Sequence, residues 1–338
     1  SLSTSPDNTV IGLTDGVLQH EYATESFYEG TGPMRRVETS LGIVEDSYVE
    51  HKYFAWKKKD FYRRNDRKVK GPQWTAVKDL EIGDKVAVGM GFDVAEPNNI
   101  SIDEAHFLGY VIGDGCLPGG GSGSRLNVDF GSQETESLAR YESALDNMGI
   151  VYTTTKHPKK KMFTVQSFGQ SSMMMDVVNK FGLHGKRAAN KTIPAEVWAS
   201  DNNVLAEFVS ALWSADGTVY MKRNKTGASP TAEYCTISDE LARDVHRALM
   251  RLGIPSALRS RIPTYTHNGE KRRGQRAYYI TTLSAESFEA FCEKISLMDH
   301  KAARQKEGLS LIGEFRYRQN LLIDGVYWDR VRSVTDIG

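Results

Sequence analysis

Apolar and polar positions follow the period of a helix in two segments that carry nearly the same pattern, about one hundred residues apart. The segments are Phe107–Gly115 and Val209–Gly217, and each is mostly apolar and ends in an aspartate followed by glycine. Residues four positions apart share one helix face, and both segments place small residues at that spacing. Because glycine within a helix costs about 1 kcal/mol relative to alanine, small residues on one face indicate close backbone packing. The small pairs are Gly109 with Gly113 and Ala211 with Ala215.

The aspartates that end the two segments are the strongest candidates for chemistry. If the helices pack through their small faces, Asp114 and Asp216 emerge side by side as a centre of two carboxylates. An acid at a helix C-terminus faces the negative end of the helix dipole, which is unfavourable unless a cation lies nearby. The alternative is that each segment is only a core helix that ends in an Asp-Gly turn.

The residues around each aspartate predict the same order of elements twice. A capping-box pattern at Ser101–Glu104 begins the first motif helix. The order is helix–strand–strand–helix–strand–strand–helix, which predicts one antiparallel sheet in each repeat. The expected strands are 125–130, 150–155, 162–167, 218–223, 234–237 and 278–282, and the expected helices are 134–148, 170–181, 239–252 and 285–295.

Composition describes an ordinary globular chain of 338 residues, with no apolar run of membrane-span length and no signal peptide, so an intracellular location is expected. Lysine plus arginine equals aspartate plus glutamate, at 43 each, so net charge gives no overall attraction to nucleic acid. Three cysteines without metal-ligand spacing fit reduced thiols. The basic residues gather in runs at 57–70, 156–161 and 259–276, which are either solvated faces or a surface that follows DNA.

The paired motifs resemble those of the LAGLIDADG homing endonucleases in their single-chain, two-repeat form. Ile112 and Ser214 stand where that family often has another acid, and Phe107 and Val209 replace its leading leucine. The resemblance implies that Asp114 and Asp216 are the acids of the active centre. It also places Lys191, within Gly185–Pro194, near that centre, and Lys301 at a comparable position of the second repeat.

The resemblance implies cleavage of both strands of a long, partly palindromic double-stranded DNA target. Two carboxylates a few ångström apart repel each other unless a cation binds, and oxygen ligands select Mg²⁺. Lys191 is expected to stabilise the phosphorane transition state or to assist the attacking water. The alternative for Lys191 is a surface lysine before a helix that begins at a proline.

The flanks of the repeats predict a β-rich unit. Val77–Val86 alternates apolar residues into a tight Gly-Asp turn, and a strand pattern fills the last residues of the chain. With the start of the chain, Gly42 and Val49–Phe54, these segments resemble the self-splicing (Hint) domain of an intein. The resemblance implies that Ser1 attacks the preceding carbonyl in an N→O acyl shift. His51 would polarise that amide and protonate its nitrogen, with either Tyr48 or Ser47 assisting.

The chain stops at Gly338 without the terminal His-Asn that the resemblance would require. The expectation is therefore the N-terminal fragment of a split intein, whose partners are a complementary C-terminal intein fragment and a flanking host protein (extein). A truncated contiguous intein is the competing account. Thr266–Gly269 contains His-Asn, but Asn-Gly is typical there of a hairpin turn.

The expected fold class is a β-rich Hint domain plus an α/β (α+β) endonuclease domain, whose two pseudo-twofold repeats each form a saddle-like antiparallel sheet with helices. The expected Hint domain comprises 1–96 and 319–338, and the endonuclease comprises repeats at about 97–195 and 196–318. Two alternatives stay open: a free-standing homing endonuclease, and a nucleic-acid-binding protein of the maturase type that does not cleave.

Overall fold

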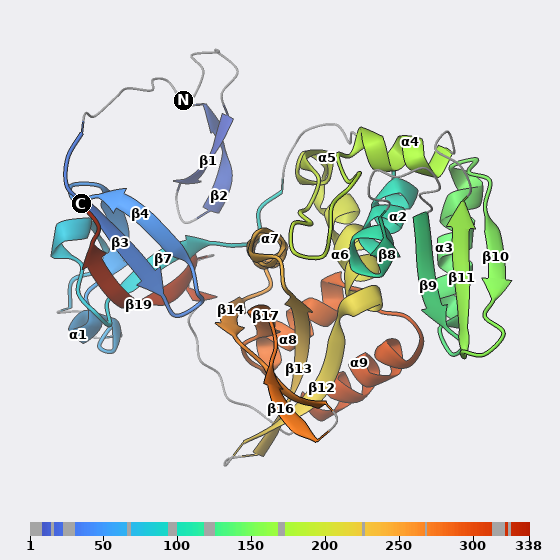
Figure 1. Cartoon of the computed structure of the whole chain (residues 1–338). Coiled ribbons are helices and arrows are strands. Elements are labelled where there is room, and N and C mark those ends of the chain that lie inside the picture. The colour runs from blue at the N-terminus through green and yellow to red at the C-terminus, as the bar shows by residue number, and fades with distance from the viewer. Residues whose placement is uncertain are drawn as a thin grey trace. The chain divides into compact units, whose positions relative to one another are not determined.

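The computed structural model describes residues 9–14, 17–22, 31–65, 69–93, 100–117, 126–167, 173–224, 227–267, 269–312, 322–323 and 326–338 (Figure 1). The chain forms two compact units, one from 1–92 with 319–338 and the other from 93–318. The first boundary lies four residues before the expected position, and the second coincides with it. Among the described residues, no helix is both long enough and apolar enough to cross a lipid bilayer.

The first unit is a β-structure in which the last strand of the chain lies in the middle of a sheet. The long strand β19 pairs with β3 through its second half and with β7 through its first half, both antiparallel, and the sheet runs β4-β3-β19-β7-β5-β6. Val37, Ala55, Val77 and Val331 form its main core. The elements are β1 Thr9–Thr14, β2 Val17–Tyr22, β3 Met34–Thr39, β4 Val44–Tyr48, β5 Lys52–Trp56, α1 Lys58–Phe61, β6 Gln73–Ala76, the 3-10 helix η1 Val77–Asp79, β7 Lys85–Gly89, β18 Leu322–Ile323 and β19 Val326–Asp336.

The turn before β7 is held by a buried carboxylate. Asp84 accepts hydrogen bonds from the backbone N–H groups of Lys58 and Glu81, at 2.9 and 3.0 Å, and pairs with the Lys57 ammonium at 2.9 Å. The backbone at Gly83 has φ of 100°, where a side chain would be strained. The alternation of apolar and polar positions expected through Val77–Val86 is wrong at its start. Residues 77–79 form the 3-10 helix η1, and β7 begins only at Lys85.

The second unit contains two similar repeats, each with one four-stranded antiparallel sheet, as the sequence predicts. The sheets run β10-β11-β9-β8 and β12-β13-β17-β14, and a separate two-stranded ribbon, β15-β16, follows β14. The helices are α2 Ile102–Gly113, α3 Thr135–Asn147, α4 Met173–Lys180, α5 Ala195–Trp198, α6 Asn202–Asp216, α7 Asp239–Arg251, α8 Ala285–Lys294 and α9 Asp299–Leu311. The strands are β8 Gly115–Cys116, β9 Leu126–Gly131, β10 Thr153–Lys156, β11 Met162–Ser167, β12 Thr218–Asn224, β13 Gly227–Thr236, β14 Ser256–Arg261, β15 Thr264–His267, β16 Glu270–Arg273 and β17 Ala277–Thr282.

The middle helix of each repeat ends in the same way. Gly149 and Gly253 have φ of 68° and 77°, in the left-handed region. The N–H groups of Ile150 and Ile254 then reach back to the carbonyls of Leu145 and Leu249, which completes a Schellman cap. Because Ile150 belongs to this cap, the strand expected at 150–155 begins only at Thr153.

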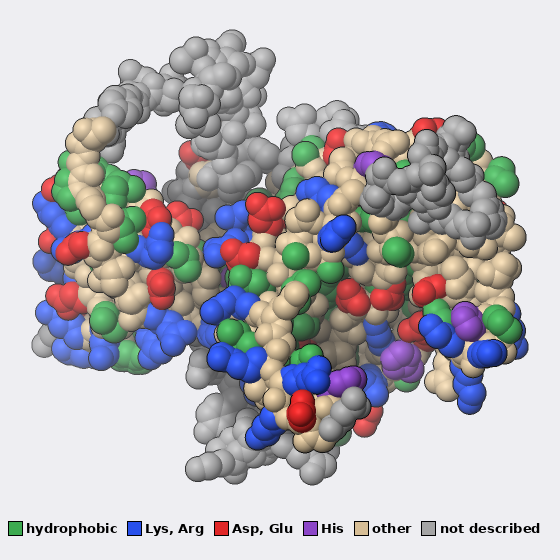
Figure 2. Space-filling view, in the orientation of Figure 1, with side chains coloured by type: hydrophobic (Ala, Val, Ile, Leu, Met, Phe, Trp, Pro, Cys, Tyr) green, Lys and Arg blue, Asp and Glu red, His purple; other side chains and the backbone are tan. Residues whose placement is uncertain are grey.

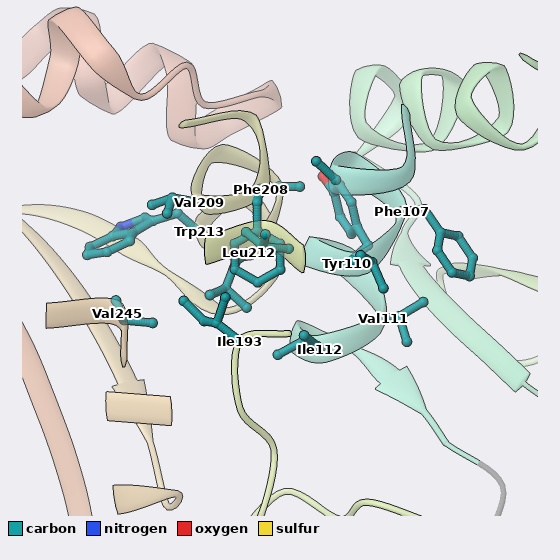
Figure 3. Packing of buried hydrophobic residues seen from close by; sticks show 14 of the residues in the cluster. Phe107, Tyr110, Val111, Ile112, Ile193, Phe208, Val209, Leu212, Trp213 and Val245 are labelled. Atoms are coloured by element: carbon teal, nitrogen blue, oxygen red, sulfur yellow. The ribbon is translucent and has the colours of Figure 1, made fainter. Parts of the chain in front are cut away.

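A continuous core joins the two repeats around the two motif helices. In Figure 3, Phe107 of α2 and Trp213 of α6 point away from each other on opposite sides of the helix pair, and Tyr110 and Phe208 lie nearer its middle. Apart from Tyr110, which is 2% exposed, these side chains have no exposed surface. Burying a large apolar side chain contributes roughly 1.5–3 kcal/mol each, so this core fixes how the two motifs meet.

Candidate active site

The two motif helices pack at backbone contact distance because their facing residues are small. A Cβ atom built on Gly109 would lie 2.6 Å from the Ala211 Cβ and 2.6 Å from the Phe208 carbonyl oxygen. One built on Gly113 would lie 2.5 Å from the Ala215 Cβ. Real Cβ atoms do not approach so closely, so both glycines are required for this approach. The packing expected from the small pairs is observed.

The paired helices end at the two candidate acids. Asp114 is the C-cap of α2, with its N–H donating to the Tyr110 carbonyl, and Asp216 is the last residue of α6. Glycine follows each acid and leads into a strand, β8 after Asp114 and β12 after Asp216. Both aspartates reach the surface, and the charge of Asp216 acts directly on Asp114.

Each motif helix ends against a buried lysine. The Lys191 ammonium donates to carbonyls of the last turn of α2 and to the Gly115 carbonyl, and the shortest contact is 2.6 Å, to Ile112. The Lys301 ammonium donates to Ser214 at 2.5 Å and Ala215 at 2.7 Å, the corresponding carbonyls of α6. The side chains are 7% and 8% exposed, so neither lysine is a surface residue. The two lysines are equivalent because each donates to the same carbonyls at the end of its motif helix. The number of residues between each lysine and its motif could not establish this.

The electrostatics of the acid pair follow from lost hydration and mutual repulsion. Loss of hydration is the larger cause and the negative charge of Asp216 the smaller one, and together they raise the pKa of Asp114 to about 6. Loss of hydration also raises the pKa of Asp216, while the charges of Lys191 and Lys301 oppose that rise. Burial lowers the pKa of both lysines, and the two aspartates oppose that lowering. The arrangement therefore favours an additional positive charge at the acids.

Two further acids that act on α2 or its terminal aspartate were missed from the sequence. Glu134, the N-cap of α3, accepts a hydrogen bond from the Gly131 N–H at 2.6 Å, and its charge raises the pKa of Asp114. Asp299, beside Lys301, accepts from the N–H groups of Glu136 and Ser137 and so caps α3 from the other repeat. The sequence offered one signal for Glu134, which is an acid three residues after the end of β9 and at the start of a helix.

The donor set limits what the site could hold. Within the described residues, no cluster of three or more His, Cys, Asp or Glu side chains is arranged to hold a metal ion. The acid pair therefore offers two carboxylates, and other ligands would have to come from water and substrate. A Mg²⁺ site of one or two carboxylates completed by phosphate oxygens is common, so the residues fit that ion.

The splicing residues expected in the flanks lie in the first unit. Ser1 lies outside the described residues. His51 is exposed, beside β5, and its ring lies edge-on to Tyr53 at 5.6 Å between centroids. Both side chains line a pocket of about 320 Å³ with Thr39 and Glu45. The Ser47 hydroxyl is 2.9 Å from the Tyr53 hydroxyl, and no described side chain hydrogen-bonds the His51 ring.

Basic side chains gather on the second repeat. Figure 2 shows lysine and arginine over the region of β14 and β16. The ribbon β15-β16 pairs Thr266 with Lys271 and Tyr265 with Arg272, and all eight of its residues are exposed. His267 pairs with Glu270 where the Asn-Gly turn is expected, and Gly269 there has φ of 81°, whereas Asn268 lies outside the described residues.

The family model described as the LAGLIDADG-like domain matches residues 203–296. This range contains Asp216 and the second sheet, so the chain carries a LAGLIDADG-like domain, and the resemblance is confirmed there. The replicative DNA helicase DnaB of Rhodothermus marinus is 26% identical over 309 residues, or 88% of this chain and 29% of the relative. Protein RecA of Mycobacterium tuberculosis is 27% identical over 310 residues, or 88% of this chain and 36% of the relative.

The chain thus spans about a third of the length of the curated relatives it matches. Among solved structures, mesophilic variants of the homing endonuclease I-DmoI resemble it with a TM-score of 0.40 at 15% identity. The likeness covers 62% of this chain and 99% of that one.

Proposed function

We propose that the second unit is a DNA endonuclease that cuts both strands of a long target with a divalent metal ion. The observation that carries this proposal is the acid pair, in which two aspartates end paired helices and loss of hydration raises the pKa of both carboxyl groups, a cost that a bound cation would offset. The LAGLIDADG-like match over 203–296 supports the same function.

In this proposal Asp114 and Asp216, one acid from each repeat, would hold Mg²⁺. A bound metal ion supplies activation of water and stabilisation of the leaving oxygen. Lys191 and Lys301 hold the two helix ends in place, because their N–H donors are already engaged with carbonyls. Their charges lie close enough to act on the carboxylates, and so they set the ionisation of the acids rather than bind phosphate directly.

A randomised plasmid library incubated with the full chain and Mg²⁺ tests this function. We expect linear double-strand products from a subset of sequences. Asp114→Asn and Asp216→Asn should abolish cutting while DNA binding survives. The matched control is Asp176→Asn, an exposed acid on α4. Undiminished cutting by either active-centre variant would refute the acid pair, and binding without any cutting by the unaltered chain would favour the maturase-type alternative.

We further propose that the first unit performs protein splicing as an intein. The DnaB and RecA relatives are different proteins, and each aligns with 88% of this chain but with only about a third of its own length. A segment shared by otherwise different proteins is typical of an inserted module. The second unit comprises 93–318, about two thirds of the chain, so these alignments extend into the first unit. The pocket beside His51 and Tyr53 also suits an amide activated by a histidine.

The splicing proposal predicts an ester at Ser1. A reporter peptide fused before Ser1 should be released by hydroxylamine, which attacks that ester. Ser1→Ala should prevent release and His51→Ala should slow it, whereas His300→Ala, an exposed histidine of the second unit, should leave it unchanged. Release from the Ser1→Ala chain at the rate of the unaltered chain would show that no ester forms.

A further inference from the structure

The exposed faces of the two sheets carry different chemistry, although their folds correspond. In the first sheet, Val128 and Val165 are at most 1% exposed and face the core, and the Thr154 hydroxyl donates to Glu142 of α3. The intervening positions therefore lie on the opposite face. In the second sheet Tyr234 and Ile280 define the core side in the same way.

The outward positions of the first sheet are mostly uncharged. Asn127 pairs in register with Gln166 and with Cys116 of β8, the strand that follows Asp114, so the two amides lie close to the acid centre. The one outward acid, Asp129, already accepts from the Thr164 hydroxyl at 2.6 Å.

Both amides lack partners in the described part of the chain. The Gln166 side chain makes no hydrogen bond there, and the Asn127 Oδ1 is covered without a donor. An unpaired buried acceptor is unfavourable because it has lost its water, and this cost is relieved if the amide turns onto a ligand that donates. Two adjacent amides without partners indicate a polar ligand with both donors and acceptors.

The outward positions of the second sheet are basic and aromatic. Lys222, Arg259 and Arg261 are exposed, and the Arg261 guanidinium lies 4.2 Å from the centroid of the Tyr279 ring. Contact with Tyr279 orders the Arg261 guanidinium, and the Arg259 guanidinium donates to the Leu258 carbonyl at 2.8 Å. Each guanidinium carries five N–H donors, so a held arginine can still donate to a base. Tyr279 pairs in register with Arg259, so the two arginines lie on the same face.

The side chains on the two faces are suited to hydrogen-bond different bases. In the major groove, asparagine and glutamine pair with adenine through N6 and N7, and arginine pairs with guanine through O6 and N7. We propose, resting on the endonuclease function above, that the target is chemically asymmetric. The half read by the first sheet contains adenines contacted by Asn127 and Gln166. The half read by the second sheet contains guanines contacted by Arg259 and Arg261.

Selection from a randomised duplex library by the full chain carrying Asp114→Asn, followed by sequencing, tests this assignment. We expect one half-site enriched in adenine and the other in guanine. The double variant Asn127→Ala, Gln166→Ala should reduce the adenine preference about tenfold and leave the guanine half unchanged. Arg259→Ala with Arg261→Ala should do the converse.

Two matched controls remove the same side-chain types away from the reading faces. Asn203→Ala lies at the first turn of α6, at the end opposite Asp216, and Arg247→Ala lies on α7, on the core side of the second sheet. Neither should alter the selected sequence. Equal base preferences in both halves, or loss of the same positions in both double variants, would overturn the assignment while leaving the endonuclease proposal intact. Failure to select any sequence would instead count against the endonuclease itself.

Discussion

At the scale of single residues, the raised pKa of Asp114 predicts a pH-dependent cleavage rate. A protonated carboxyl cannot serve as a metal ligand, so the rate should fall as the pH drops below about 6. It should level off above that value. Cleavage of a selected target from pH 5 to 8, at a Mg²⁺ concentration well below saturation so that the metal does not displace the proton, measures this profile. A flat profile across pH 6 would contradict the assigned ionisation.

The same raised pKa predicts that the acid centre is unfavourable for stability. A group whose folded pKa lies above its ordinary value stabilises the fold at low pH and loses that contribution as the pH rises, here between about 4 and 6. In thermal unfolding at pH 7.5, Asp114→Asn should therefore have a free energy of unfolding larger than that of the unaltered chain by about 1 kcal/mol, after allowance for solvent screening. The difference should disappear below about pH 4.

The two buried lysines should shift the ionisation of both acids. Lys191→Met or Lys301→Met removes a positive charge that lowers the pKa of Asp216, so the acid limb of the rate profile should move to higher pH. The rate at pH 7 should fall about tenfold or more. Lys306→Met, an exposed lysine on the same helix as Lys301, is the control. A slower rate with an unmoved acid limb would indicate a purely structural role.

At the scale of elements, the packing of α2 against α6 gives a reciprocal test. Gly113→Ala should destabilise the second unit by about 1–3 kcal/mol, because its Cβ would lie 2.5 Å from that of Ala215. Ala215→Gly removes the obstructing atom, and the next neighbour is 3.7 Å away, so the double variant should recover most of that stability. Urea unfolding of the four chains measures the coupling.

The corresponding pair one turn earlier serves as a control for that rescue. A Cβ on Gly109 would also lie 2.6 Å from the Phe208 carbonyl oxygen and 2.9 Å from the Leu212 nitrogen, which are backbone atoms. Ala211→Gly therefore cannot relieve Gly109→Ala to the same degree. Equal rescue at both positions would show that the helices separate rather than meet as observed.

The elements that the sequence predicted are those whose patterns are local. Helix α2 begins after the expected Ser101 cap, and α7 lies within one residue of its expected bounds, whereas α6 begins at Asn202, seven residues before the expected segment. The first half of β13 was missed because its Gly-Ala-Ser-Pro sequence has no strand preference, and pairing with β12 determines it. Helix α9 was missed because its polar residues show little helical periodicity, so Lys301 was expected after the last helix rather than within one.

The candidate site was predictable in part for the same reason. Asp114 and Asp216 are marked by a repeated pattern, and small residues determine how their helices meet. The equivalence of Lys191 and Lys301 depends on where distant segments lie in the fold, which the sequence does not state locally. Glu134 likewise acts on Asp114 only through tertiary structure.

At the scale of the whole molecule, the basic ribbon should contribute to DNA affinity through charge. Each basic side chain that neutralises a phosphate adds about 0.9 to the slope of log affinity against log salt. Replacing Lys271, Arg272 and Arg273 with alanine should therefore reduce that slope by about 2 to 3 without changing the cutting position. The control removes Arg247, Lys294 and Lys306, which lie on helices. An unchanged slope would exclude the ribbon from the DNA interface.

The discontinuous first unit makes its folding depend on residues far along the chain. Strand β19 pairs with β3 and β7, and Trp328 and Val331 are buried in its cores. A chain that ends at Arg318 lacks this central strand, so the first unit should become sensitive to protease while the second unit, with its own core, resists and still binds DNA. A chain that ends at Asp336 retains the strand and should resist in both units. Protection of the first unit in the shorter chain would show that β3 and β7 fold without their shared neighbour.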